Sequence, residues 1–297
     1  MRTPAFLIAP LLVLTLLPAC ASIERPAPAQ SELTDDDLRR LPVYDGATGQ
    51  RVAWDDVVNE LARADAVLVG EMHGHAVGLP AAAVLYDDML DQNPAGALAL
   101  EFWERDQQSE IDAYLAGETP RDDFTAGRGS QYPADHARML EAAKANDLPV
   151  VAANAPRRFV RLARTEGYDH LRGTLTDEER AWLVIPDQLD EGPYRDRFFN
   201  LMGGMRGHSE GSEDLYQDLM VLSFYRAQQV WDATMSDSVA TLVNDGHTPT
   251  LLVIGRFHTD HEGATTTRTR ALLPGRAVRT ITFATRDLGL QGLQPED

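Results

Sequence analysis

Four carboxylate and imidazole side chains follow short apolar segments of the sequence, in positions where they could bind a cation or transfer protons. They are Glu71, His73, Glu101 and His258. Two histidines and two carboxylates are a plausible ligand set for zinc, manganese or iron. Without a metal, the same side chains could act as general acids and bases. The alternative is that Glu71 and Glu101 only cap nearby helices or pair with Arg256.

Five short apolar segments predict buried β-strands that would position these side chains. They lie at residues 66–69, 97–100, 150–153, 251–254 and 278–283. Between the first three segments, apolar residues recur at intervals of three and four, as they do in amphipathic helices. This alternation predicts an α/β fold, with a parallel β-sheet flanked by helices. Ligands bind beyond the carboxyl ends of the strands in such sheets, so we expect the four side chains to share a cleft.

Two further segments interrupt or precede this alternation. Residues 43–52 have the pattern of a small β-hairpin around a glycine-rich turn. Residues 174–245 contain a capping-box signal at Thr176, a glycine-rich stretch that ends at His208, and a long helical pattern from Ser212. We therefore expect a smaller helical subdomain, inserted at about 174–245, before the fourth strand of the sheet.

The remaining polar candidates differ in how close they should lie to the cleft. Asn154 follows the third predicted strand and is expected to bring an amide to the cleft. His75 and His261 follow the site residues closely in sequence, so they would either support the site or lie on the plain surface. The histidines expected to be solvated are His136, His170 and His247.

The N-terminal segment predicts export and lipid anchoring. Arg2 precedes an uncharged, mainly apolar segment at residues 5–17. That segment is too short to cross a hydrocarbon core about 30 Å thick, but it suits a signal peptide. Leu17-Pro18-Ala19-Cys20 resembles a bacterial lipobox, so we expect residues 1–20 to be a lipoprotein signal peptide with lipidation at Cys20. An ordinary signal peptide followed by an incidental thiol is the alternative.

The Pro- and Ser-rich residues 21–42 are expected to form a tether to the membrane, and residues 43–297 the folded domain. Cys20 is the only cysteine, which excludes a disulfide framework. The net charge is −19, so nucleic acid is not an expected partner, and the membrane is expected to be contacted through the lipid anchor only. The sequence also lacks the motifs of serine hydrolases, zincins, P-loop NTPases and nicotinamide enzymes.

Motifs along most of the chain resemble one known family. The first are Val67-Leu68-Val69-Gly70-Glu71-Met72-His73, Leu100-Glu101-Phe102 with Gln107-Gln108, and Asn154-Ala155-Pro156-Arg157. The others are residues 227–235, which read Ala-Gln-Gln-Val-Trp-Asp-Ala-Thr-Met, and Ile254-Gly255-Arg256-Phe257-His258 with Gly263. In their order and spacing, from about Val43 to Gly263, they resemble the ChaN-like haem-binding uptake lipoproteins. That family shares a superfamily with the Tiki metalloproteases and the erythromycin esterases. Gly74-His75 departs from the family, which has Asp or Asn after its Gly-Glu-x-His.

The resemblance implies a haem-binding lipoprotein that acts in iron acquisition at the bacterial cell envelope, on its periplasmic or extracellular face. The residues expected around haem are Glu71, His73, Glu101, Asn154, His258, Tyr132 and His208. The axial ligand stays open among Tyr132, His208 and the cleft histidines, because haem iron accepts phenolate or imidazole ligands. A homodimer that holds haems between its subunits is also open. The alternative function is a metal-dependent hydrolase that uses a divalent metal at the strand ends.

Overall fold

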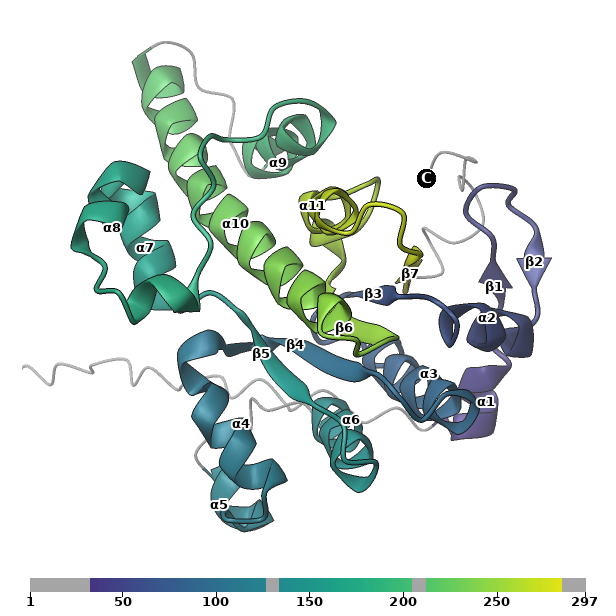
Figure 1. Cartoon of the computed structure of the whole chain (residues 1–297). Coiled ribbons are helices and arrows are strands. Elements are labelled where there is room, and N and C mark those ends of the chain that lie inside the picture. The colour runs from purple at the N-terminus through teal and green to yellow at the C-terminus, as the bar shows by residue number, and fades with distance from the viewer. Residues whose placement is uncertain (1–32, 127–133, 205–211, 285–297) are drawn as a thin grey trace, which may run out of the picture.

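A computed structural model describes residues 33–126, 134–204 and 212–284 of the chain (Figure 1). Its central feature is a parallel sheet of five strands in the order β5-β4-β6-β3-β7. The strands are β3 (Ala66–Glu71), β4 (Ala97–Glu104), β5 (Val150–Asn154), β6 (Thr250–Gly255) and β7 (Val278–Thr282). Each contains or overlaps one of the five predicted apolar segments, and the predicted parallel α/β sheet is confirmed.

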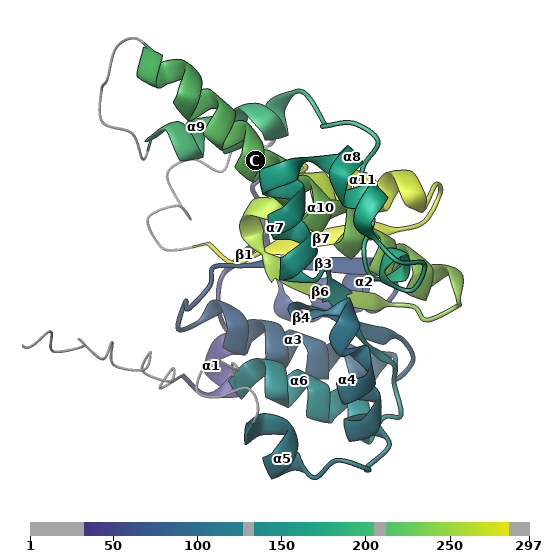
Figure 2. The same ribbon diagram turned by 90° about the vertical axis from the view of Figure 1, so that its left-hand side faces the viewer.

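Helices cover both faces of this sheet, as Figure 2 shows. On one face lie α1 (Asp35–Arg39), α2 (Trp54–Leu61), α3 (Gly78–Gln92), α4 (Gln108–Leu115), α5 (Arg121–Ala126) and α6 (Ala134–Ala145). On the other lie α7 (Arg157–Glu166), α8 (Tyr168–Thr174), α9 (Pro193–Gly204), α10 (Ser212–Asn244) and α11 (Ala264–Leu272). Successive side chains of a strand point to opposite faces, so Val67 and Val69 pack under the first layer and Ala66 and Leu68 under the second.

The helical region predicted at about 174–245 is present, but its long helix also belongs to the main core. The C-terminal half of α10 packs Met235, Val239 and Val243 against the sheet. Its N-terminal half projects beyond the sheet beside α9 (Figure 1). Thr176 and Glu179 bond reciprocally as the predicted capping box, before the short helix η3 (Glu179–Trp182).

The folded domain begins earlier than expected, because part of the predicted tether is helical. Thr34 caps α1, and Leu38 is only 2% exposed. Arg39 forms an ion pair of 2.7 Å with Asp88 on α3. Burial of Leu38 and this pair attach the helix to the domain. The predicted hairpin follows as β1 (Val43–Tyr44) and β2 (Arg51–Val52), which pair antiparallel.

None of the helices in the described ranges combines the length and apolar character needed to cross a membrane. Cys20 and the predicted signal peptide lie outside the described residues, as do Tyr132 and His208.

Candidate functional site

The predicted side chains meet around Gly255, the last residue of β6. In the register of the sheet, Gly255 lies opposite Glu71 of β3. Its N–H donates to Oε2 of Glu101, on the other neighbouring strand, at 2.6 Å. A Cβ atom on residue 255 would lie 3.1 Å from Nε2 of His73 and 3.7 Å from Oε2 of Glu101. Glycine therefore lets an imidazole from one side and a carboxylate from the other approach the same point.

Glu71 and His73 form a tight pair at the end of β3. Oε1 of Glu71 lies 2.5 Å from Nδ1 of His73. The hydrogen bond to Glu71 raises the pKa of His73 to about 9, and Glu101 adds to the effect. Glu71 is 5% exposed, whereas the His73 side chain is 73% exposed. A buried carboxylate thus orients an imidazole whose other nitrogen, Nε2, lies beside Gly255.

His258 is buried between two carboxylates. It lies in the short helix η4 (Arg256–His258), directly after β6. Its Nδ1 is 2.7 Å from Oδ1 of Asp232, and its Nε2 is 3.6 Å from Oε1 of Glu101. Burial alone lowers the pKa of His258, but Asp232 more than compensates, and the net pKa is raised. The imidazole is therefore held between Asp232, its hydrogen-bond partner, and Glu101.

Asp232 is a site residue that the strand-end argument missed. It is fully buried on α10 and also accepts hydrogen bonds from Tyr194 (2.9 Å) and Thr265 (2.7 Å). The sequence contained a signal for it. Gln228, Asp232 and Ser236 recur every four residues, so they line one face of the helix. All three side chains are buried. The buried face of α10 is therefore polar in the part of the helix that approaches His258.

Other candidates have structural contacts instead. Asn154 donates from Nδ2 to the backbone carbonyl of Glu101 at 3.0 Å, and its Oδ1 accepts from the N–H of Ala155. Nδ1 of His75 accepts two hydrogen bonds from backbone N–H groups, and the shorter of the two, at 3.0 Å, comes from Gly78. Its proton must then be on Nε2, which removes the lone pair that a metal would need. Arg256 forms its ion pair with Asp260, at 2.5 Å, and therefore needs neither Glu71 nor Glu101 as a partner.

His136 was expected to be solvated, and this prediction is wrong. The side chain is 5% exposed and packs edge-on to Phe102, with ring centroids 5.8 Å apart. Burial lowers the pKa of His136 to about 4. Within the described part of the chain, neither ring nitrogen has a hydrogen-bond partner, nor does Oε2 of Glu71, which interacts electrostatically with this imidazole. His170 is exposed, as predicted, whereas His247 is partly buried.

The four predicted residues share an edge of the sheet but do not form a metal-ligand shell. Across residues 33–126, 134–204 and 212–284, no three His, Cys, Asp or Glu side chains are placed to hold one metal ion. The reason is that they bond to one another, to the backbone and to Asp232. Glu71 binds His73, Glu101 accepts the N–H of Gly255, and Nδ1 of His258 is bonded to Asp232.

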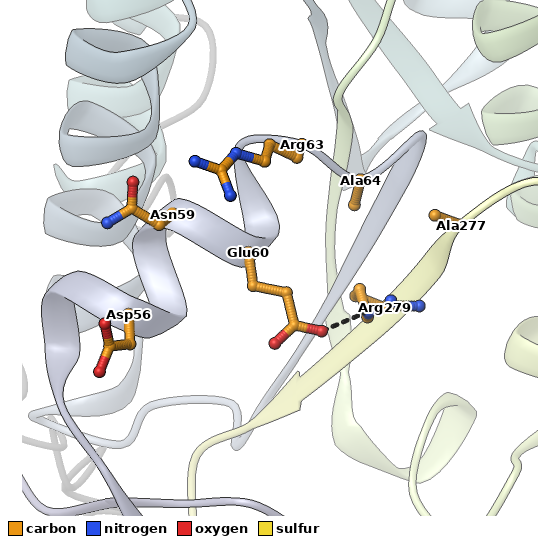
Figure 3. Close-up of a pocket in the computed structure, with 7 residues that line it drawn as sticks. All are labelled: Asp56, Asn59, Glu60, Arg63, Ala64, Ala277 and Arg279. Atoms are coloured by element: carbon orange, nitrogen blue, oxygen red, sulfur yellow. Dashed lines mark hydrogen bonds and ion pairs between the residues drawn. The ribbon is translucent and has the colours of Figure 1, made fainter.

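An open pocket elsewhere on the domain has a different character. It lies between α2 and β7, where Glu60 and Arg279 form an ion pair of 2.7 Å (Figure 3). Its lining residues are Asp56, Asn59, Glu60, Arg63, Ala64, Ala277 and Arg279. Ala64 and Ala277 shortly precede β3 and β7, so the pocket is at the amino ends of these strands. It contains none of the predicted site residues.

Comparison with known proteins gives the family and the fold. Residues 57–268 match the family described as haem-binding uptake, Tiki superfamily, ChaN. A solved structure of ChaN from Campylobacter jejuni, described as "Cofacial heme binding to ChaN", aligns with a TM-score of 0.63 and 15% identity, covering 86% of this chain and 92% of that one. A mutant of the erythromycin esterase EreC, in its open conformation, aligns over 81% of this chain and 76% of its own, with 12% identity and a TM-score of 0.44. No curated protein sequence matches. Since the family match covers most of the chain, the protein belongs to the ChaN family of haem-binding uptake proteins in the Tiki superfamily.

Proposed function

We propose that this protein binds haem beside Gly255, as a lipid-anchored protein of the bacterial cell envelope that acts in haem or iron uptake. The observation that carries the proposal is the exposed imidazole of His73. Its Nδ1 is held by the buried carboxylate of Glu71, which leaves Nε2 directed away from that partner. Imidazoles that bind metals are commonly oriented in this way by a carboxylate on the other nitrogen. Haem supplies an iron that accepts such a nitrogen.

Phe257 beside His258 is only partly buried, so part of its ring can contact a large aromatic ligand. The ring of Phe257 lies 5.3 Å from that of Tyr194 and 6.0 Å from that of Phe198. Aromatic side chains provide the apolar contact area that a macrocycle requires. Membership of the haem-binding uptake family supports the same ligand. Because the Campylobacter structure is described as showing cofacial haem binding, we extend the proposal to a homodimer of this chain.

Haem titration of the purified chain tests this function. We expect a Soret band to form with the wild type and binding to weaken about tenfold or more in His73→Ala, the scale of metal-site perturbations. His170→Ala is the matched control, because it removes an exposed imidazole from α8. Absence of a haem complex in the wild type would refute the function. Sedimentation of the haem complex measures whether two chains associate.

The pH dependence of binding tests the role of His73 separately. Because the pKa of His73 is raised to about 9, its imidazole is protonated at neutral pH. Iron binding must displace that proton, so affinity should rise with pH, by at most about tenfold per unit, and level off near pH 9. His73→Ala should remove this slope. A slope that persists in the variant would point to another titrating ligand, such as Tyr132.

The hydrolase alternative predicts tightly bound divalent metal. Because Glu101 and His258 are bonded to the N–H of Gly255 and to Asp232, whereas the imidazole of His73 is exposed, the geometry favours the haem proposal. Metal analysis of the same preparation separates the two functions. Stoichiometric zinc or manganese, lost in Glu101→Gln, would support the hydrolase and contradict our choice.

A further inference from the structure

Arg197 is a half-buried arginine whose charge has no hydrogen-bonded counterpart. Within the described residues, Nε and both terminal nitrogens of its guanidinium are buried and have no hydrogen-bond partner. Other half-buried arginines bind carboxylates at 2.7 or 2.6 Å, as Arg39 does with Asp88 and Arg138 with Asp87. A buried charge without a partner is costly, so an unpaired group in a folded protein calls for an explanation such as a missing ion or ligand.

The position of Arg197 connects it to the strand-end site. It lies on α9, and its guanidinium carbon is 5.6 Å from the ring centre of Tyr194 and 5.5 Å from that of Phe257. Phe257 directly precedes His258, and the Tyr194 hydroxyl donates to Asp232. The guanidinium therefore lies on the aromatic cluster that borders the buried imidazole.

A second guanidinium belongs to Arg256, which directly precedes Phe257 in the short helix η4. Arg256 binds Oδ2 of Asp260 through Nε, but one of its terminal nitrogens, Nη1, is buried without a partner among the described residues. Oδ1 of Asp260 accepts from Thr282 at 2.8 Å, so both oxygens of this carboxylate are occupied. Asp260 is also the carboxylate that acts electrostatically on Arg197. Asp260 thus pairs with Arg256 and acts on Arg197 only through space, so the charge of Arg197 is left without a bonded carboxylate among the described residues.

We propose that Arg197 and Arg256 form an anion-binding subsite beside Phe257, which takes a carboxylate of the bound haem. The choice of haem as the source of the carboxylate rests on the proposed function. Planar guanidinium groups bind carboxylates through paired, charge-assisted hydrogen bonds, and the partly buried ring of Phe257 beside Arg197 provides an apolar contact for the body of the same ligand. In a chain with a net charge of −19, this local excess of positive charge selects an anionic group.

The subsite predicts that the wild type distinguishes haem from its dimethyl ester, which has no free carboxylate. We expect the full chain to bind haem about tenfold or more tightly than the ester. Arg197→Gln should bind the two alike, and Arg197→Lys should keep part of the preference because it keeps the charge. Arg195→Gln is the matched control, since Arg195 lies on the same helix but stacks on Phe199, 4.2 Å from the ring centre. A preference for the free acid that survives in Arg197→Gln would overturn the proposal.

Two measurements on the haem-free chain test the subsite without haem and show whether Arg197→Gln is folded. Removing an uncompensated charge should leave the thermal midpoint of Arg197→Gln equal to or above that of the wild type. Inorganic phosphate should raise the midpoint of the wild type and not that of Arg197→Gln. If phosphate acts in this way while haem and its ester bind alike, the subsite takes a free anion and the haem assignment is overturned. If the chain binds no haem at all, the proposed function fails, and the phosphate measurement alone decides whether Arg197 binds an anion.

Discussion

At the scale of residues, the site combines buried polar groups that have hydrogen-bond partners with others that have none among the described residues. Asp232 is fully buried and has three hydrogen-bonded neighbours, so its charge is well compensated. In contrast, His136 and Oε2 of Glu71 are buried without partners among the described residues, although they interact electrostatically. Unsatisfied buried groups reduce stability and are most often retained where a ligand or a function needs them.

The buried imidazole of His136 should make the protein sensitive to acid. Its pKa is about 4 in the folded chain because burial disfavours the charged form, against about 6.5 in the unfolded chain. Between these values only the unfolded chain takes up the proton, so stability is lost as pH falls from about 6.5 to about 4. The loss is at most about 3 kcal/mol for this group. Denaturant unfolding at both pH values should show a smaller loss in His136→Leu.

Exposed His170 supplies the control, because His170→Leu should lose stability on acidification as the wild type does. At neutral pH we expect His136→Leu to be as stable as the wild type or more stable, since leucine has no polar nitrogens to leave unpaired. An equal acid loss in the wild type and in His136→Leu would contradict the burial of a neutral imidazole.

At the scale of elements, the sequence predicts where the strands are better than it predicts which strands lie side by side in the sheet. Four of the five strands are local apolar segments, so their pattern is visible in the sequence. Edge strand β7 contains Arg279 and two threonines, and of its residues Val278 is buried. The order β5-β4-β6-β3-β7 is set by contacts between distant segments, which no local pattern encodes. Helix α1 is hard to distinguish from a tether in the sequence, because it is acidic and Leu38 is its single buried residue. The burial of His136 is hidden in the sequence for a similar reason, since Asp135 and Arg138 beside it indicate a solvated helix.

The end of β6 depends on glycine for the geometry of the site. In Gly255→Ala the new Cβ would meet Nε2 of His73 at 3.1 Å, and this exposed side chain can move away. We expect little change in unfolding free energy, within about 1 kcal/mol. Haem affinity should fall about ten- to a hundredfold, as for other perturbed metal sites. The pKa of His73, followed by NMR, should also move from about 9 towards its ordinary value.

Gly173→Ala is the control for this change. A Cβ there meets nothing within 4 Å, so the substitution in α8 should leave haem binding unaltered. If Gly255→Ala kept both the wild-type affinity and the pKa of His73, the role assigned to Gly255 would be wrong.

At the scale of the whole molecule, the two layers of helices serve different purposes. The layer of α1 to α6 forms most of the large apolar core under the sheet. The layer of α7 to α11 supplies Asp232 and Arg197, and its helix α9 stands away from the sheet beside the N-terminal half of α10 (Figure 1). The candidate site therefore lies where the sheet meets the second layer. Its residues come from β3 and the turn after it, β4, β6, η4, α9 and α10, so no short segment of the sequence contains it.

The lipid anchor predicted at Cys20 should be separable from folding. Cys20 precedes the described residues, and the first buried side chain of the described domain is Leu38. We therefore expect Cys20→Ser to abolish metabolic labelling with a fatty acid and to leave the thermal midpoint and the haem affinity of the domain unchanged. Labelling of the wild type and of the variant to the same extent would refute lipidation at Cys20. A lower thermal midpoint in the unlabelled variant would instead show that the anchor contributes to the fold.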